Sequence, residues 1–519
     1  MFKRIGRYEE AIDGVIHGFD RIVFQGYIRP IVFPEGAMNF FDSKGILYKD
    51  AKFWMESHTK KLIARIEEMA VKATGLGIIP IKSLTIRKEA LAHDQQKKLG
   101  IQSGLIGVWS STESASSFKI IPAQGRPKLR CVNTKCKHLY LYFDDPTYGF
   151  MNIRIQTWFP YKIQIALNGR EWLSRQLDKA GVNYERQKNK FTHIDDYKKA
   201  QLFLDRQVSI NWVDMLNKFS ALGFPTMKTT LGSDYSYTWS CWQSEWASDM
   251  IFNNATAMKD MMKRGVEHTF MAGDAGSLMR FFGRPNNKNG EPHHAFKGNA
   301  QSTVKEFNSG FRVKHWIDHN SVKLYNEANV VRIETTINDP SQFKVHRHKQ
   351  NQNKDEPKSL LPMRKGVADM TVRAQVSQEV NDRFSEHLNE MDSDVPLKDV
   401  IDPVMKRKTK NDRSVRGLDP FGKDREFLNA ISNGKFIVSG FTNKDLRELL
   451  SSSKQFKGKD EKQISGFVTR VIRLMRDHNL IRKYPKQHKY RLQNDGRKLA
   501  LLINAAMSAS TQKLSDIAA

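Results

Sequence analysis

Alternating apolar and polar residues predict a β-hairpin at residues 320–340, NSVKLYNEANVVRIETTINDP. A strand repeats every two residues, so side chains at alternate positions share a face. One face collects the apolar residues Val322, Leu324, Val331, Ile333 and Ile337. The opposite face collects the polar residues Lys323, Tyr325, Arg332 and Glu334. Because the wet side of an antiparallel sheet usually carries a looser mixture of Thr, Ser and Lys, this polar face indicates a functional surface.

Similar patterns along the chain predict further strands and long helices. Strands are expected at residues 11–33, in GLIGVWSS and FKIIP, between 137 and 167, and at 311–317. Helices are expected at about 49–74, 168–181, 195–221, 243–263 and 367–390. Together these elements predict an α+β protein with mixed or antiparallel sheets and long helices.

The length of 519 residues favours several domains over one compact core. We expect an N-terminal α/β region at 1–182 and a central α+β region at 183–393 that holds a three-stranded basic sheet. Residues 394–423 mix Pro, Gly and basic residues, which is typical of a linker. A separate domain is expected at 424–519.

The segment 424–519 has the element order of a winged helix-turn-helix domain. Helices are expected in DREFLNAISN, FTNKDLRELL and KQISGFVTRVIRLMRDHNLI, followed by two strands around a turn at 485–488 and a last helix. In this motif the third helix enters the major groove of DNA and the wing lies over the neighbouring backbone. From Ile464 to Lys498, ten Lys or Arg stand against two Asp or Glu, a net charge of +8. The residues expected to contact DNA are Thr469, Arg470, Arg473, Arg476, Lys483, Lys486 and Lys489.

This segment resembles the winged-helix family of bacterial regulators, in which a DGR-type helix start follows the third helix and the wing. The phrases HGFDRIVFQGYIRP, NGREWL and RKGVADM give nearly the whole chain a wider resemblance. It resembles a bacterial protein family in which a long N-terminal region precedes a winged helix. That resemblance implies a fold and no particular chemistry.

The net charge of +28, with a pI of about 9.8, indicates a polyanionic partner. Nucleic acid is the first candidate, and a membrane is not expected because the chain has no apolar run of 18 or more residues. The N-terminus lacks the apolar stretch of a signal peptide, so we expect a cytoplasmic, nucleoid-associated protein. Cys131, Cys136 and His138 lack the second ligand pair of structural zinc, so zinc is not favoured.

The strand GFRVKHWIDH adds cations and an aromatic residue next to the hairpin. Cations follow phosphates and aromatic faces stack on bases, so a basic sheet with interleaved aromatics suits single-stranded or distorted nucleic acid. The sheet residues expected to bind nucleic acid are Arg312, Lys314, Lys323 and Arg332, with Trp316 and Tyr325 among them. The alternative is that helices cover this face and its polar groups pair with one another.

The same face could instead be a catalytic centre. Nucleases and strand-transferring enzymes need carboxylates that hold Mg²⁺, or a nucleophile such as Tyr beside a metal. The candidates are Tyr325, Glu334, Asp20, Glu245 and Asp249, with the last two at helical i,i+4 spacing. The stretch VKLYNEANVVRIETTI resembles the YDK…LRxE strand pair of plasmid and phage replication initiators, which implies a nicking activity.

The function favoured by the sequence is nucleic-acid binding, with a DNA-binding winged helix and a basic sheet, in a mobile element or replication system. The first alternative is a metal-dependent DNA endonuclease, either a replication initiator or a transposase-like protein, with Mg²⁺ as cofactor. The second is a protein that binds structured RNA. Clustering of Asp20, Glu245, Asp249 and Glu334 within metal distance favours the enzyme, whereas dispersed carboxylates favour binding alone.

Overall fold

The structure, a computed structural model, describes residues 6–508 apart from 82–85, 123, 125–126, 273–274, 285–297, 308–309, 350–354, 390–396, 411, 433–435, 437–439 and 485–486. The chain divides into two units. The sheet unit contains residues 1–266 and 275–387, and the C-terminal unit contains 267–274 and 388–519. Each unit is described by itself below.

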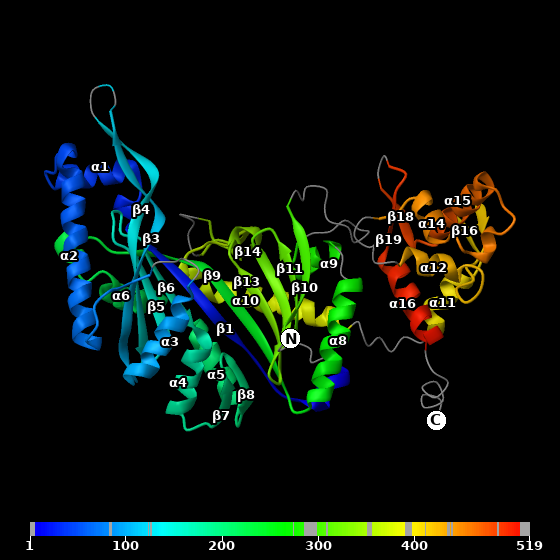
Figure 1. Cartoon of the computed structure of the whole chain (residues 1–519), viewed down its shortest axis with the longest axis horizontal. Helices are drawn as coiled ribbons and strands as arrows, with labels where there is room; N and C mark the ends of the chain where they lie inside the picture. Colours follow the sequence, from blue (N-terminus) through cyan, green and yellow to red (C-terminus); the bar gives the residue numbers. More distant parts are fainter. Residues whose placement is uncertain are drawn as a thin grey trace. The chain divides into compact units, whose positions relative to one another are not determined.

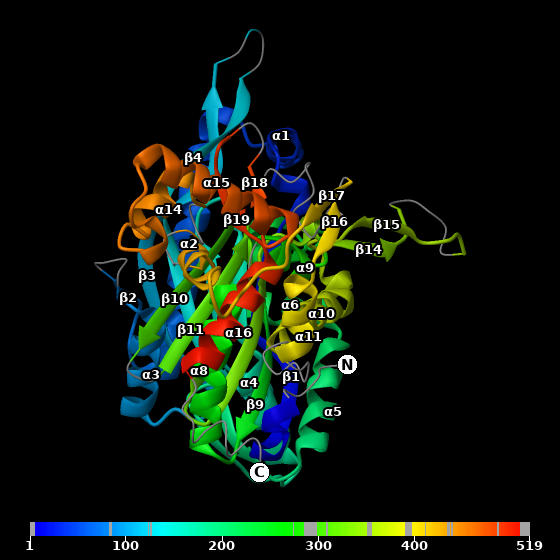
Figure 2. The same cartoon turned by 90° about the vertical axis from the view of Figure 1, so that its right-hand side faces the viewer.

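An eleven-stranded sheet organises the sheet unit (Figure 1 and Figure 2). Its strand order is β10-β11-β12-β13-β9-β1-β6-β5-β4-β3-β2. The pairs are antiparallel except β2 with β3, which is parallel. The strands, in chain order, are β1 (Ile12–Tyr27), β2 (Ile79–Pro80), β3 (Gly104–Ile121), β4 (Lys128–Asp145), β5 (Gly149–Gln156), β6 (Ile163–Asn168), β9 (Thr238–Phe252), β10 (Ala300–Phe307), β11 (Gly310–Ile317), β12 (Asn320–Glu327) and β13 (Val330–Ile337).

Helices and small hairpins accompany this sheet. The helices are α1 (Pro34–Ser43), α2 (Tyr48–Thr74), α3 (Lys88–Leu99), α4 (Gly169–Lys179), α5 (Tyr197–Val208), α6 (Trp212–Gly223), α7 (Met227–Leu231), α8 (Ala255–Ala272), α9 (Ala275–Phe281) and α10 (Met370–Asn389). The hairpins are β7 (Tyr184–Gln187) with β8 (Lys190–Ile194), and β14 (Lys344–Arg347) with β15 (Ser359–Pro362).

The two faces of the sheet differ in chemistry. The polar face is the one that carries Trp316, Lys323, Glu334 and Glu245, as the cross-strand register shows. Helix α10 covers the opposite face, where the Asn381 amide donates to Ser248 Oγ at 2.9 Å. Around β1, the polar face instead meets α4, α5 and the β7–β8 hairpin. The middle of the polar face is therefore bordered by these elements rather than by a long covering helix.

Local sequence explains how α4 reaches β1. The Asn168 side chain accepts hydrogen bonds from the backbone N–H groups of Arg170 and Glu171, so Asn168 is the N-cap of α4. A Cβ at Gly169 would lie 1.9 Å from the Phe19 carbonyl oxygen. Only glycine permits this approach, which brings Arg170 onto the polar face.

The apolar core lies mainly on the other side of the sheet. Its aromatic centre includes Phe40 and Phe41 of α1, with Phe159 packed against both at ring-centroid distances of 5.9 and 5.3 Å. The amphipathic helix α2 buries Leu62 and Ile66 against the same cluster. The sequence correctly placed a long helix here.

Strands β3 and β4 extend beyond the rest of the sheet as a two-stranded arm. Their pairing continues to Ile121 with Lys128, whereas β5 pairs only with residues 138–145 of β4 (Figure 1). The sequence predicted two short strands in GLIGVWSS and FKIIP. That prediction is wrong, because one strand of 18 residues runs through both.

The C-terminal unit has a core of its own. Its elements are α11 (Leu397–Met405), β16 (Lys408–Lys410), β17 (Arg413–Val415), α12 (Arg425–Ile431), α14 (Asn443–Leu449), α15 (Glu461–Asp477), β18 (Ile481–Lys483), β19 (Tyr490–Leu492) and α16 (Asn494–Ser508). Helix α15 buries Val468, Ile472 and Met475. Thr442 caps α14 in a capping box with Asp445.

Two sequence predictions about organisation do not agree with the structure. The segment 394–423 is not a free linker, because Ile401, Val415 and Leu418 are buried in the core of the C-terminal unit. The expected boundary at 182 and 183 does not separate two folds, since β1 pairs with β9 in one sheet. Long-range strand pairing joins regions that look separate along the chain.

Candidate metal centre on the polar face

A β-bulge in β1 places Asp20 and its neighbour Arg21 together on the polar face. Phe19 pairs with Trp246 and Arg21 pairs with Glu245, so Asp20 is an extra residue between two consecutive positions of β9. A bulge leaves one residue unpaired and redirects its side chain. Asp20 lies on the face that carries Glu245, as does Gly18 two residues before it, which pairs with Ala247.

Strand β9 supplies two carboxylates to this face. The sequence predicted a helix at 243–263, which is wrong for its first half, because Thr238–Phe252 is a strand. Positions four apart share a face in a strand as well as in a helix. Glu245 and Asp249 therefore still lie on one side, flanking Ala247, which pairs with Glu334 of β13.

Asp20, Glu245 and Glu334 form a three-carboxylate cluster. One oxygen from each carboxylate lies within 4.8 Å of the other two. The cluster thus brings together three of the four carboxylates that the sequence nominated. It lies on the adjacent strands β1, β9 and β13 at the middle of the sheet.

The fourth carboxylate, Asp249, is occupied by two arginines. Arg332 Nη2 donates to Asp249 Oδ2 at 2.7 Å, and Arg170 Nη2 lies 2.9 Å from the same oxygen. Burial alone would raise the pKa of the Asp249 carboxyl, but the charges of Arg332 and Arg170 hold it below its usual value. Asp249 is therefore a structural anion that anchors two buried cations.

Arg332 is consequently unavailable to a nucleic acid. Its side chain has no exposed surface, and its Nη1 lies 2.9 Å from Asp20 Oδ1. The prediction that Arg332 contacts nucleic acid is wrong, because the β7–β8 hairpin covers its side chain on the polar face of β13. Asn189 in that hairpin turn hydrogen-bonds Asp20 through its side chain and Arg332 through its carbonyl oxygen.

Tyr325 hydrogen-bonds to the cluster through Glu334. The Tyr325 hydroxyl donates to Glu334 Oε2 at 2.7 Å, and Lys190 Nζ lies 3.0 Å from the same hydroxyl. Burial, with the charge of Glu334, raises the pKa of Tyr325 well above its usual value, so the hydroxyl is neutral. Burial and the nearby Arg332 lower the pKa of Lys190 to about 8.

Lys323 neutralises Glu334 on the neighbouring strand. Its ammonium forms an ion pair with Glu334, and its side chain is only 15% exposed. Burial would raise the pKa of Glu334, but the charges of Lys323 and Arg332 lower it. Lys323 therefore balances the cluster, whereas the sequence had placed it among the residues that bind nucleic acid.

Glu245 is the exception in this network. Among the described residues it has no hydrogen-bond or ion-pair partner, although it lies beside Asp20 and Glu334. Burial and then the charge of Glu334 raise the pKa of Glu245 to about 7. A partly exposed carboxylate without a partner, next to two others, is a position where a cation or a proton is needed.

The raised pKa of Glu245 predicts how stability depends on pH. Between its ordinary value of 4.5 and about 7, the folded state binds more protons at Glu245 than the unfolded state, so stability falls as pH rises through that window. Glu245→Gln removes this titration. At pH 8 without added metal, we expect it to raise the free energy of unfolding by about 1–3 kcal/mol. Urea denaturation at pH 5 and pH 8 measures this difference, and an equal effect at both values would contradict it.

Strand β11 places free cations and an aromatic ring beside the cluster. Register pairs Lys314 with Lys323 and Arg312 with Tyr325, so these side chains share the polar face. Lys314 Nζ lies 4.4 Å from the centre of the Trp316 ring. Within the described part of the chain, neither Lys314 nor Arg312 forms an ion pair with a carboxylate. The basic, aromatic surface that the sequence predicted is thus confined to β10 and β11.

The predicted DNA-contacting residues of the C-terminal unit lie mostly on its surface. Thr469, Arg470, Arg473 and Arg476 are exposed on α15, Lys483 is exposed on β18, and Lys489 is half-buried. Lys486 lies outside the described residues. The Thr469 hydroxyl also accepts a hydrogen bond from Asn443, which ties α15 to α14.

Sequence reasoning missed Arg170, Asn189 and Lys190, the residues that surround the cluster from outside β1, β9, β12 and β13. The alternation of apolar and polar residues does not identify them, because Arg170 reaches the sheet from the start of α4 and the other two from the turn of the β7–β8 hairpin.

Comparisons of the chain with protein-family models, with curated proteins and with solved structures gave no match. Among the helices of the described residues, none has the length and apolar character needed to cross a membrane. The chemistry proposed for the cluster follows from its geometry.

Proposed function

We propose that the protein is a nucleic-acid-processing enzyme whose sheet unit cleaves phosphodiester bonds with the help of a divalent cation. The observation that carries this proposal is the carboxylate of Glu245 beside Asp20 and Glu334, which pairs with no other described residue. Dispersed carboxylates would have favoured a binding protein, and three of them lie together instead.

The cluster fits a hard cation. All three donors are carboxylate oxygens, which is the ligand type of Mg²⁺ and Mn²⁺. Lys323 and Arg332 occupy one side of Glu334 and Asp20, so Glu245 would be the least hindered ligand. A bound cation would supply Lewis-acid polarisation of a phosphoryl oxygen.

The chain's own residues divide the remaining tasks. Arg312 and Lys314 would bind phosphates, and Trp316 would stack on a base of an unpaired strand. Glu245, whose pKa in the absence of a cation is about 7, would be ionised above neutral pH and so available to hold the cation. The neutral Tyr325 hydroxyl would hold Glu334 in place through its hydrogen bond.

A binding protein without catalysis is the second candidate. In its favour, Asp20, Asp249 and Glu334 already lie among Arg170, Arg332, Lys190 and Lys323. Such ion pairs can stabilise a sheet without taking part in catalysis.

Cleavage of labelled DNA and RNA, single-stranded and duplex, separates the two candidates. We expect cleavage of at least one substrate in Mg²⁺ or Mn²⁺ and none in EDTA. The same cations should raise the melting temperature of the protein more at pH 8 than at pH 6, because Glu245 must lose its proton to bind them. Binding of nucleic acid without cleavage in either metal, and without a thermal shift, would favour the second candidate.

We further propose that the C-terminal unit is a winged helix that binds duplex DNA. In support, α12, α14 and α15 are followed by the strand pair β18 and β19. Arg470 and Arg473 lie on the exposed side of α15, where a recognition helix presents its base contacts.

Replacing Arg470 and Arg473 with Ala should weaken duplex binding by about 1–3 kcal/mol for each Arg that contacts a base. A gel-shift titration at fixed salt measures this effect. Replacing Lys398 and Lys406, which are exposed around α11, removes the same charge outside the helix and wing. Equal losses in the two double variants would indicate a non-specific charge effect.

A further inference from the structure

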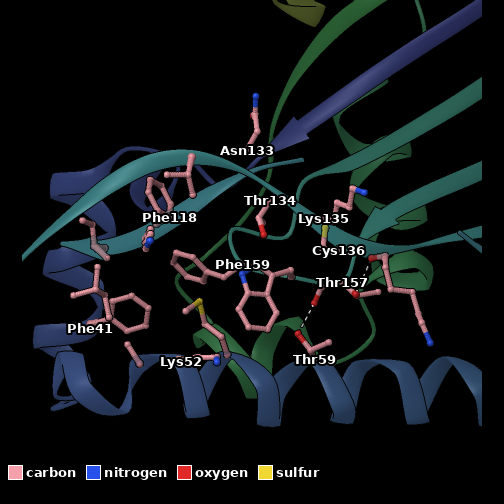
Figure 3. Close-up of a pocket in the computed structure, with 18 residues that line it drawn as sticks. Phe41, Lys52, Thr59, Phe118, Asn133, Thr134, Lys135, Cys136, Thr157 and Phe159 are labelled. Carbon is pink, nitrogen blue, oxygen red and sulfur yellow. Dashed lines mark hydrogen bonds between the residues drawn. The ribbon is translucent and has the colours of Figure 1, made fainter. Parts of the chain in front are cut away.

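A separate cavity lies between α2 and the β3–β4 arm, on elements that contribute no residue to the carboxylate cluster. Its volume is about 670 Å³. Figure 3 shows Phe41, Phe118 and Phe159 between the helix and the arm. Opposite them, Thr59 Oγ1 of α2 donates to the Thr157 carbonyl oxygen at 2.8 Å, and the Thr157 hydroxyl donates to the Lys137 carbonyl oxygen of β4 at 2.8 Å (Figure 3). The size and the apolar interior are those of a ligand pocket.

The charged residues that line this cavity all carry positive charge. Four of its lining residues are lysines, namely Lys52, Lys119, Lys135 and Lys137, and each is exposed. None of the described residues that line it is acidic. Lys52 lies 3.8 Å from Glu56 on its own helix, whereas the other three have no ion pair within the described part of the chain. Mutual repulsion of such cations is relieved by an anion with several charges.

We propose that this cavity binds an unpaired base of a nucleic-acid strand, with the neighbouring phosphates on the lysines. An apolar cavity with aromatic walls suits the face of a base, and several separate cations suit successive phosphates. A fatty acid would fill the apolar interior, but its single carboxylate would neutralise only one of the four lysines. This inference rests on the proposed function only in taking nucleic acid as the partner, and it places a second strand contact on the arm.

Cross-linking locates the bound base directly. A single-stranded oligothymidylate that carries one 5-iodouracil is irradiated with the full-length protein in EDTA, so that cleavage plays no part. We expect cross-linked peptides that contain residues 118, 132–137 or 157–159. Cross-links confined to β10 and β11 would overturn the proposal, and they would leave the proposed strand-binding surface standing.

Charge reversal tests the lysines. Lys52→Glu with Lys135→Glu changes one residue on α2 and one on β4, and should lower strand affinity roughly tenfold while reducing the salt slope of log affinity by about 2. Lys60→Glu with Lys128→Glu makes the same change on the same two elements outside the cavity. Equal affinities of the two double variants would overturn the proposal. So would uptake of a fluorescent fatty acid by the cavity with strand binding unchanged in the first variant.

Discussion

Replacing Arg332 with methionine is expected to lower the free energy of unfolding of the sheet unit by about 3–5 kcal/mol. The guanidinium pairs with Asp249 and Asp20 where neither acid can be fully hydrated. Its loss leaves Asp249 buried with Arg170 as its remaining cation. Removing one partner of a buried pair costs more than the pair contributes, because the remaining charge stays in a medium that solvates it poorly. Urea denaturation followed by tryptophan fluorescence measures the loss.

Arg312→Met is the matched control for this prediction. Arg312 and Arg332 are both opposite Tyr325 in the sheet register, one on each neighbouring strand. Arg312 is half-exposed and lies 4.8 Å from the Phe307 ring, and no carboxylate of the described residues pairs with it. We expect it to change stability by less than about 1 kcal/mol. Equal losses for the two variants would show that the buried network contributes little.

Replacing Glu245 with Gln, or Asp20 with Asn, is expected to reduce metal-dependent cleavage by roughly 10²–10³-fold. Each change keeps the shape of the side chain and removes one anionic ligand from the cluster. Initial cleavage rates at saturating Mn²⁺, measured on the substrate that the wild type cleaves, provide the test. Strand affinity in EDTA should remain close to that of the wild type, because these carboxylates do not attract phosphates.

Glu306→Gln supplies the control for the loss of charge. Glu306 is exposed on β10, in the same sheet but outside the cluster. We expect normal cleavage from this variant. Wild-type rates for Glu245→Gln and Asp20→Asn would remove the cluster from the reaction, even if the protein cleaves nucleic acid.

Local periodicity was sufficient to predict the strands of the hairpin and the contents of its two faces. Val322, Leu324 and Ile333 are buried on one side and Lys323 and Glu334 lie on the other. Periodicity gave the wrong secondary structure for β9. Glu245 and Asp249 are four residues apart, and this spacing places two side chains on one face in a helix and in a strand alike. The two carboxylates were thus placed correctly on one face with the wrong secondary structure, and only Glu245 belongs to the cluster.

The position of Arg21 beside the cluster could not be predicted from the same rule. Simple alternation from Gly18, which pairs with Ala247, would place Asp20 on the polar face and Arg21 on the other. The bulge lets Arg21 pair with Glu245 as well, and only the three-dimensional pairing of β1 with β9 reveals it. Similarly, no local pattern shows that Arg332 is buried, because the β7–β8 hairpin that covers its side chain is more distant in the sequence.

The wide separation of the three carboxylates along the chain has a consequence for the timing of protein synthesis. Asp20 is made early, but its strand β1 pairs with β6 and β9, and the cluster is complete only when Glu334 of β13 has left the ribosome. At 5–20 residues per second, β1 waits on the order of 10–50 s for β9. A nascent or truncated chain that ends before β13 therefore lacks Glu334 and cannot assemble the three-carboxylate cluster. Cleavage that depends on the proposed cation site would be withheld from unfinished copies of the protein.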